Sequence, residues 1–286
     1  MNDTSKPINK KVTIPALKSL YLNEEKISMI TAYDYTMARI VDAAGADIIL
    51  VGDSLGMVVQ GHQHTLPVDI EHMIYHTQCV AKGVSRAHIV ADMPFLSYQV
   101  SHEEAVRNAG RLLKAGAESI KIEASEEFSD LVWYMNRIGI PVMAHIGLKP
   151  QSYHTMGGNR VQGKSKAEGD EIFNDAKAFE EAGAYALLLE GIPMELAQEI
   201  TDSIEIPTIG IGSGVNCSGQ VLVSYDILGS NPDFEPRFVR KYMDLYGDAK
   251  QAFERFISDV QLGKFPDEEE SAHRNLVTVK PAGTKD

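Results

Sequence analysis

The sequence predicts an α/β protein whose eight strands and connecting helices close into a (β/α)8 barrel. Three observations predict it: short apolar runs recur eight times, longer amphipathic segments separate them, and the runs are continuously apolar. Continuous hydrophobicity is typical of strands covered on both faces, as in a parallel sheet with helical crossovers. An open doubly wound sheet is the alternative, but a count of eight favours the barrel.

The expected strands and helices alternate along the chain. The strands are residues 28–33, 47–51, 88–92, 119–123, 141–145, 186–190, 207–211 and 221–225. Apolar residues at three- and four-residue spacing predict helices over residues 35–44, 69–82, 101–115, 126–137, 168–182 and 193–202. Several of these end in Ala-Gly, a helix C-cap signal, and Ser101 is placed to cap the third. Residues 212–220 are too few for a full helix, so we expect an abbreviated last crossover.

We expect one barrel domain over residues 1–286, because an α/β barrel commonly uses about 250 residues. A short N-terminal extension covers residues 1 to about 25, and residues 235–262 form a further amphipathic helical stretch. From about residue 266 to 286 the chain turns polar, with an acidic run that we interpret as a solvated tail.

Composition excludes several classes of protein. The 27 Lys and Arg against 40 Asp and Glu give a net charge of −13, which argues against a nucleic-acid partner. No window approaches about 18 consecutive apolar residues, and the first 20 residues lack the apolar run of a signal peptide, so we expect no membrane partner. Two cysteines, Cys79 and Cys217, are too few for a disulfide scaffold and fit the reducing cytoplasm.

Ionisable residues stand at the carboxyl ends of five otherwise apolar strands. They are Asp53, Asp92, Glu123, His145 and Glu190. In barrels that end is the active-site face. Burying a lone carboxylate costs several kcal/mol, so several at one rim indicate that a cation gathers there. Any one of them alone would pass as a surface residue of a loop.

These residue types favour metal-assisted chemistry on an anionic substrate. Asp53, Asp92 and Glu123 supply the hard oxygen ligands that suit Mg²⁺. Lys121 lies two residues before Glu123 and so points to the same side of its strand, although an internal salt bridge is the simpler interpretation. Such a site would attract a 2-oxo acid, whose polarised ketone acidifies the neighbouring C–H bond, with Glu190 as the base.

Two other signals are weaker. The pairs His62 and His64, and His72 and His76, have metal-like spacing without an accompanying carboxylate or cysteine, and we interpret them as loop and helix-surface residues. The glycine-rich residues 210–214 follow the seventh strand, where many barrels bind phosphate, but a tight turn is an equal alternative.

At these positions the sequence resembles the ketopantoate hydroxymethyltransferases. The matching runs include Val-Gly-Asp-Ser-Leu-Gly-Met at 51–57, Ala-Asp-Met-Pro-Phe at 91–95 and Ile-Lys-Ile-Glu at 120–123. Further matches lie at 31–34, 59–62, 65–67, 145–148, 150–152, 161–163, 189–193, 209–214 and 219–223. They keep their order from about residue 28 to 270, so the resemblance covers nearly the whole chain.

The resemblance implies a TIM barrel of the phosphoenolpyruvate/pyruvate type that assembles as a cytoplasmic homodecamer. Its substrate would be 3-methyl-2-oxobutanoate, its one-carbon donor 5,10-methylenetetrahydrofolate, and its product 2-dehydropantoate in pantothenate and coenzyme A biosynthesis. Mg²⁺ would be held by Asp53, Asp92 and Glu123, the last directly or through water. The substrate contacts would be Asp53, Ser54, Asp92, Lys121 and His145. Glu190 would remove the C3 proton, giving a metal-stabilised enolate that attacks the folate methylene carbon.

The chain departs from the family pattern at a few positions. Family members commonly carry an acidic residue at the place of Ser218 and a histidine at that of Tyr225, and Asn159 and Arg160 replace an aromatic residue and a lysine. These departures concern folate contacts and subunit packing more than the chemistry. The rival hypotheses are a C–C lyase or mutase on the same barrel, and a metabolite-binding protein in which the charges form a structural ion-pair network.

Overall fold

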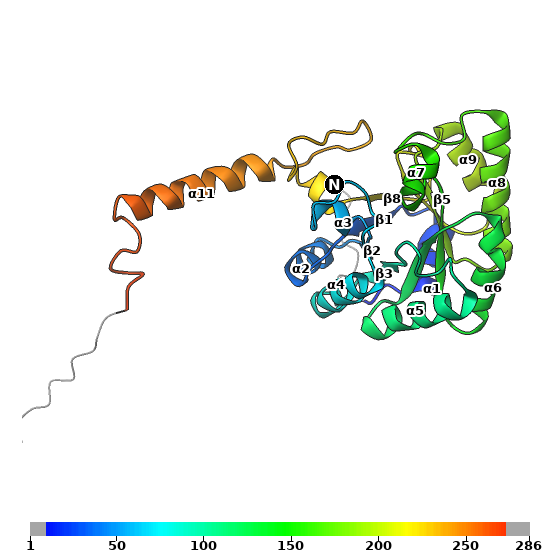
Figure 1. Cartoon of the computed structure of the whole chain (residues 1–286), viewed down its shortest axis with the longest axis horizontal. Coiled ribbons are helices and arrows are strands. Elements are labelled where there is room, and N and C mark those ends of the chain that lie inside the picture. The colour runs from blue at the N-terminus through cyan, green and yellow to red at the C-terminus, as the bar shows by residue number, and fades with distance from the viewer. Residues whose placement is uncertain (1–9, 273–286) are drawn as a thin grey trace, which may run out of the picture.

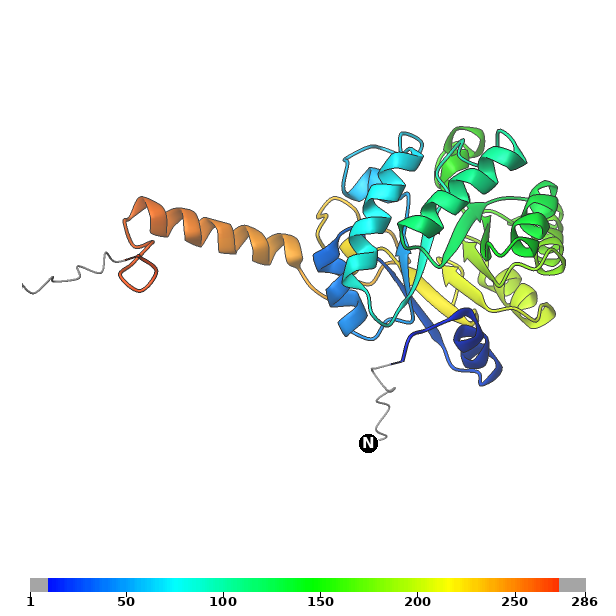
Figure 2. The same cartoon turned by 90° about the horizontal axis from the view of Figure 1, so that it is seen from below.

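The computed structural model describes residues 10–272, and its eight parallel strands close into a barrel (Figures 1 and 2). The strands are β1 (Ile27–Thr31), β2 (Ile48–Val51), β3 (His88–Asp92), β4 (Ser119–Glu123), β5 (Val142–Gly147), β6 (Ala186–Glu190), β7 (Thr208–Ile211) and β8 (Gly219–Leu222). Strand β1 pairs with both β2 and β8, which closes the ring. The predicted barrel is therefore confirmed, and the open sheet is wrong.

Helices cover the outside of the barrel where the sequence predicts them. The long ones are α2 (Tyr35–Ala43), α4 (Ile70–Gly83), α5 (His102–Ala115), α6 (Ser129–Arg137), α8 (Lys166–Glu181) and α9 (Met194–Ser203). Capping residues set the ends of these helices. At the start of α5 the Ser101 hydroxyl accepts a hydrogen bond from the Glu104 amide, and at its end Gly116 adopts a left-handed conformation. As expected, no helix lies between β7 and β8.

The barrel is sealed at its amino end and open at its carboxyl end. Helix α1 (Ile14–Leu22) begins at the N-cap residue Thr13 and lies within the segment expected as an extension. Val12 and Leu17 join the apolar cluster that fills the barrel, which includes Met29 and Val90. Because this packing closes the amino end, a small molecule can reach the interior only from the carboxyl ends of the strands.

Two predicted elements are wrong in position. The last strand was expected at residues 221–225, but β8 ends at Leu222 and α10 (Ser224–Ile227) follows, where the Ser224 amide donates to the Thr31 hydroxyl. The helix expected from residue 235 begins only at residue 245, as α11 (Leu245–Gln261). The Asp244 side chain accepts from the Gly247 amide and so caps α11 at this point. The amides of Tyr242 and Leu245 donate to the carbonyl oxygens of Ile227 and Leu228, which holds the preceding segment against α10.

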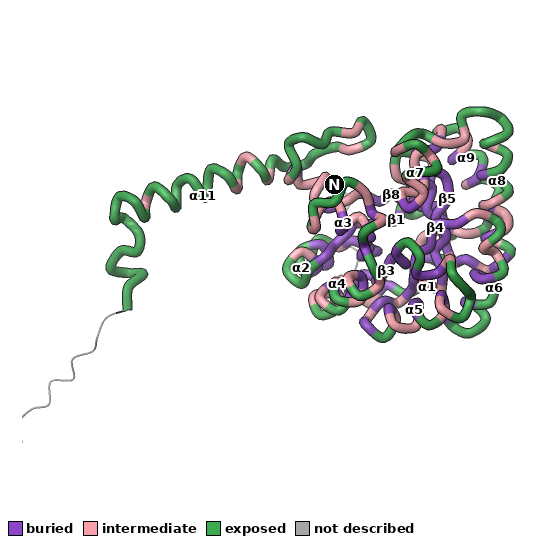
Figure 3. Tube along the Cα trace, viewed as in Figure 1, coloured by how far each residue is buried: buried purple, intermediate pink, exposed green. Residues whose placement is uncertain are grey.

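Helix α11 extends away from the barrel, and none of its residues is buried (Figure 3). The remaining short elements are α3 (Leu55–Val58), η1 (Glu126–Phe128), η2 (Pro150–Ser152) and α7 (Tyr153–Met156). Of the expected polar tail, residues 273–286 lie outside the described residues, as do residues 1–9 of the expected extension. Both cysteines are free thiols. Across residues 10–272, no helix combines the length and apolar character needed to span a membrane.

Candidate active site

A cavity of about 860 Å³ opens at the carboxyl ends of the strands. The ionisable residues expected at this rim all line it: Asp53, Asp92, Lys121, Glu123, His145 and Glu190. Strand register explains their meeting, since Asp92 pairs with Lys121 and Glu123 with His145 on neighbouring strands. The structure thus brings together side chains that are far apart in the sequence.

Alternation along β4 sends its charged residues into the barrel. Ile120 and Ile122 belong to the core beneath the outer helices, whereas Lys121 and Glu123 line the cavity. Asp92 is 3%, Lys121 3% and Glu123 6% exposed, so these charges lie largely out of water.

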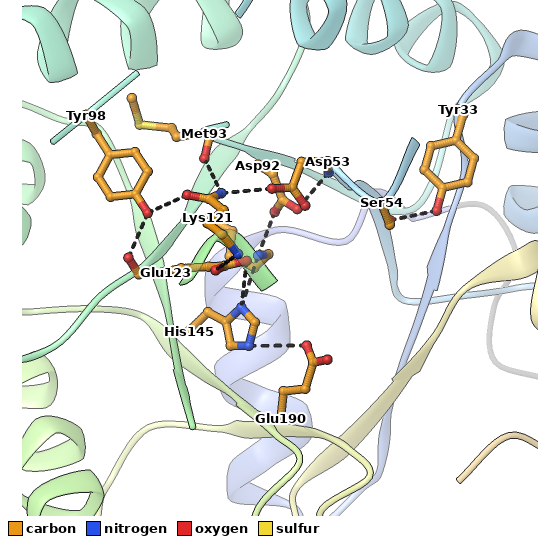
Figure 4. A network of polar contacts seen from close by, with 11 residues as sticks. Tyr33, Asp53, Ser54, Asp92, Met93, Tyr98, Lys121, Glu123, His145 and Glu190 are labelled. Carbon is orange, nitrogen blue, oxygen red and sulfur yellow. Dashed lines mark hydrogen bonds and ion pairs between the residues drawn. The ribbon is translucent and has the colours of Figure 1, made fainter. Parts of the chain in front are cut away.

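Lys121 is the cation of the cluster (Figure 4). Its Nζ lies 3.0 Å from Oδ1 of Asp92 and 3.3 Å from Nδ1 of His145. Burial opposes its charge, but the carboxylates of Asp92, Glu123 and Asp53 outweigh burial and raise the pKa of Lys121 above its ordinary value. The ammonium therefore stays charged at neutral pH.

One ammonium does not compensate all the carboxylates around it. Burial, reinforced by the charge of Asp92, raises the pKa of Asp53 to about 7. Burial and then the charge of Asp53 raise the pKa of Glu123 well above its ordinary value. Further positive charge at this rim would be stabilising, because it would let these carboxyl groups ionise without mutual repulsion.

His145 is neutral and has a defined tautomer. Burial, assisted by the charge of Lys121, lowers the pKa of His145 well below its ordinary value. Its Nδ1 faces the Lys121 ammonium, which can only donate, so the ring proton belongs on Nε2. That Nε2 is buried, lies 3.3 Å from Oε2 of Glu190 and lacks the geometry of a hydrogen bond.

Glu190 lies at the end of β6 with its side chain 21% exposed, more open than the other carboxylates of the cluster. Burial raises the pKa of Glu190 to about 7, and Lys121 opposes this shift. A carboxylate with a pKa near neutrality is suited to take up a proton at physiological pH.

Ser54 lies beside the cluster at the start of α3. Its Oγ is 2.8 Å from the hydroxyl of Tyr33, a residue 1% exposed at the end of β1. The hydroxyl of Ser54 is thus held next to Asp53 at the cavity wall.

A model of the family described as ketopantoate hydroxymethyltransferase matches residues 11–268. The chain belongs to this family. A 3-methyl-2-oxobutanoate hydroxymethyltransferase of Anaeromyxobacter sp. (strain Fw109-5) is 48% identical over 97% of this chain and 92% of that protein. One of Carboxydothermus hydrogenoformans (strain ATCC BAA-161 / DSM 6008 / Z-2901) is 50% identical over 91% of this chain and 95% of that protein.

Solved structures agree on the fold. A phosphonopyruvate hydrolase, solved in complex with oxalate and Mg²⁺, superposes with a TM-score of 0.62 at 14% identity, covering 90% of this chain and 92% of that one. A 2,3-dimethylmalate lyase of the PEP mutase/isocitrate lyase superfamily gives a TM-score of 0.56 at 17% identity, over 90% of this chain and 91% of that one. These likenesses support the (β/α)8 barrel fold.

Two of the departures from the ketopantoate hydroxymethyltransferase pattern line the cavity, and one lies far from it. Tyr225 and Asn159 are in the cavity wall, and the Tyr225 ring lies 5.9 Å from that of Tyr33. Ser218 stands before β8, where its amide donates to the Thr208 hydroxyl at the amino end of the barrel. Arg160, the fourth departure, is not among the residues that line the cavity, so only Tyr225 and Asn159 are placed to contact a ligand.

The donor set of this family member fits a hard divalent cation. The three carboxylates offer oxygen ligands only, and the buried Oδ1 of Asp92 has no hydrogen bond, only the ion pair with Lys121. Among residues 10–272, no three His, Cys, Asp or Glu side chains form a complete metal site. Mg²⁺ does not require one, since it commonly takes one or two carboxylates and fills its shell with water and substrate oxygens.

Several residues of the weaker sequence signals, the histidine pairs and the glycine-rich segment, make hydrogen bonds within the fold. His72 completes the capping box of α4, and His76 Nδ1 lies 2.6 Å from the Tyr33 carbonyl oxygen. His64, in contrast, lies in the cavity wall with its ring 5.4 Å from that of Tyr153. In the glycine-rich segment after β7, the Ser213 hydroxyl donates to the Leu189 carbonyl oxygen of the neighbouring strand β6.

Sequence reasoning missed Gln151 as a site residue. Its amide Nε2 lies 2.8 Å from Oδ2 of Asp53, and its backbone amide donates to Oε2 of Glu123 at 2.8 Å. It falls within a run matched to the family, but nothing in its local sequence indicates contact with a carboxylate 98 residues away.

Proposed function

We propose that the chain transfers a hydroxymethyl group from 5,10-methylenetetrahydrofolate to 3-methyl-2-oxobutanoate, giving 2-dehydropantoate for pantothenate biosynthesis. Membership of the family and the names of the relatives support the substrate. The observation that carries the proposal is the meeting of a buried carboxylate cluster, its single lysine and Glu190 in one cavity. A cavity of about 860 Å³ has room for a drug-sized ligand, more than a small oxo acid requires.

Asp53, Asp92 and Glu123 are the residues that would hold Mg²⁺, and the fit of the donors described above supports this choice. When bound, the ion would polarise the C2 ketone and so acidify the C3–H bond. The Lys121 ammonium and the Ser54 hydroxyl would bind the anionic substrate, since both face the cavity beside Asp53.

Glu190 would take the C3 proton onto a carboxylate oxygen. The electron pair left by that C–H bond would form the new bond to the methylene carbon of the folate. Both carbon–nitrogen bonds of that methylene group would break and water would supply its hydroxyl group, while the C3 proton and one proton of the water go to the two nitrogens of tetrahydrofolate. His145, neutral and with its proton on Nε2, would orient the Glu190 carboxylate across the 3.3 Å between them. The Lys121 ammonium on the other side of the ring maintains this tautomer.

Product formation tests this proposal directly. The chain incubated with Mg²⁺, 3-methyl-2-oxobutanoate and 5,10-methylenetetrahydrofolate should form 2-dehydropantoate, followed by mass spectrometry, and chelation of Mg²⁺ should stop it. No product over a range of donor concentrations would favour a C–C lyase or mutase on the same barrel.

The exchange of the C3 proton of the oxo acid with deuterium should rise with pH and level off above about pH 7. Burial raises the pKa of Glu190 to about 7, so the carboxyl is protonated below that value and cannot accept a proton. The rate should fall about tenfold for each pH unit below the pKa. NMR of the C3 signal measures it, and the melting temperature over the same range serves as control. A rate that falls between pH 6 and 8 as pH rises would contradict Glu190 as base.

We also propose that the chain works in the cytoplasm as a homo-oligomer, a decamer by resemblance to the family. Its two free thiols support a reducing compartment. The exposed face of α11 supports assembly, because Phe253, Phe256, Ile257 and Val260 recur at helical spacing and are 48–67% exposed. Monomers seldom leave such a face in water.

Charges on this face should break the assembly. The double substitution Phe253→Glu and Ile257→Glu places carboxylates where apolar contact is expected, so sedimentation velocity should report smaller particles. Gln251→Glu adds a charge to the same helix at an exposed polar position and should leave the particle size unchanged. An unaltered size in the double variant would show that α11 does not carry the assembly.

A further inference from the structure

Gln151 links two carboxylates of the cluster through two different groups. It lies in η2, is 6% exposed, and places its backbone amide 2.8 Å from Oε2 of Glu123. Its side-chain Nε2 lies 2.8 Å from Oδ2 of Asp53 and 2.9 Å from the Met93 carbonyl oxygen. One residue of the loop after β5 thus holds side chains from the ends of β2 and β4.

The orientation of the Gln151 amide follows from its neighbours. Asp53 Oδ2 and the Met93 carbonyl can only accept when Asp53 is ionised, so they require the two protons of the NH₂ group. Rotating the amide would set its oxygen against both acceptors. Its Oε1 instead faces the hydroxyl of Tyr98 at 2.9 Å, a group that also lies 2.7 Å from the Glu123 carbonyl oxygen.

In each of the carboxylates of Asp53, Glu123 and Asp92, one oxygen accepts a hydrogen bond from a neighbouring residue. Asp53 uses Oδ2 for Gln151, Glu123 uses Oε2 for the Gln151 amide, and Asp92 uses Oδ2 for the Asp53 amide at 3.0 Å. Within the described residues, the second oxygens of Asp53 and Glu123 accept no hydrogen bond and are left for a ligand, whereas that of Asp92 faces the Lys121 ammonium at 3.0 Å. The nearby charge of Asp92 disfavours an ionised Asp53, and the hydrogen bond from Gln151 opposes this effect because it stabilises the carboxylate.

We propose that Gln151, oriented by Tyr98, is a positioning residue that aims the Asp53 carboxylate at the divalent cation and the oxo acid. This inference rests on the proposed function. The backbone amide of Gln151 holds the loop to Glu123 independently of the side chain. The contact with Asp53 is therefore available to serve the site.

Substitution of Gln151 by Met tests this role, because the two side chains have similar length and Met has no donor. The substitution retains the backbone contact to Glu123 and removes the side-chain hydrogen bonds to Asp53, to the Met93 carbonyl oxygen and from Tyr98. Isothermal titration with Mg²⁺, at saturating 3-methyl-2-oxobutanoate and without folate, should show about 10–100-fold weaker Mg²⁺ binding. The exposed Gln78 on α4 provides the matched control, since Gln78→Met should bind Mg²⁺ as the unaltered chain does.

Tyr98→Phe provides the second test, and it keeps the ring that packs against Phe128. It should weaken Mg²⁺ binding in the same direction by a smaller factor. Because Tyr98 acts through Gln151, the double variant should bind no more weakly than Gln151→Met alone. Additive losses in the double variant would overturn the link between the two residues.

The controls separate two kinds of failure. If the unaltered chain binds no Mg²⁺ in the presence of the oxo acid, the proposed function fails, and this inference fails with it. If the unaltered chain binds Mg²⁺ and both variants bind it equally well, only the inference fails. A melting temperature close to that of the unaltered chain, with weakened Mg²⁺ binding, distinguishes positioning from a general loss of structure.

Discussion

Glu190→Gln should abolish exchange of the C3 proton of 3-methyl-2-oxobutanoate while leaving the oxo acid bound. The amide has the shape of the carboxylate but cannot accept a proton, and a positioned base contributes about 10²–10⁴-fold to such a step. Glu190 is the carboxylate whose pKa burial sets near 7, and it lies beside the neutral His145. NMR of the deuterated product measures the exchange, and calorimetry with the oxo acid and Mg²⁺ measures binding.

The measurement is made without folate, so it isolates proton removal from the transfer step. Glu195→Gln, at an exposed position of the first turn of α9, is the matched control and should exchange at the rate of the unaltered chain. Full exchange in Glu190→Gln would remove Glu190 as the base. Loss of binding together with exchange would instead assign Glu190 to holding the substrate.

Lys121→Met should destabilise the fold strongly and in a pH-dependent way. It removes the ammonium that lies among Asp53, Asp92 and Glu123 and leaves those charges buried without it. Breaking a buried ion pair costs about 3–5 kcal/mol, which we expect to see in the free energy of unfolding at pH 8. Because bound Mg²⁺ would replace part of the missing charge, millimolar Mg²⁺ should recover some of this stability.

The sign of the pH dependence follows from the carboxyl groups. Losing Lys121 raises the pKa of Asp53 and Glu123 further in the folded state, since Lys121 lowers both. When the pKa of a carboxyl group is higher in the folded than in the unfolded state, the free energy of unfolding falls as pH rises from the unfolded pKa to the folded pKa. The free energy of unfolding of the variant should therefore be closer to that of the unaltered chain at pH 5.5 than at pH 8. Urea unfolding at both values measures this, with exposed Lys82→Met as control. Equal destabilisation at both would show that the carboxyl groups do not carry the effect.

Strand-level features could be predicted from the sequence because they are local. A strand covered on both faces needs a continuous apolar run, so the eight runs located the strands, and a polar residue ending such a run identified Asp92, Glu123 and Glu190. The prediction for the last strand was wrong because the strand-like sequence pattern continues to residue 225, whereas β8 ends at Leu222. Val223 and Tyr225 suit a strand, yet the Ser224 amide donates to the Thr31 hydroxyl and the chain turns into α10.

By itself the sequence determined the βα order, the open face of the barrel and the residue types at that face, because hydrophobic periodicity and strand ends are properties of neighbouring residues. Only the tertiary structure decided the tautomer of His145, the near-neutral pKa of Glu190 and the contacts of Gln151. Each of these depends on burial and on charges brought within a few ångströms from distant parts of the chain. Electrostatic interaction follows distance in space and local dielectric, neither of which can be read from separation along the sequence.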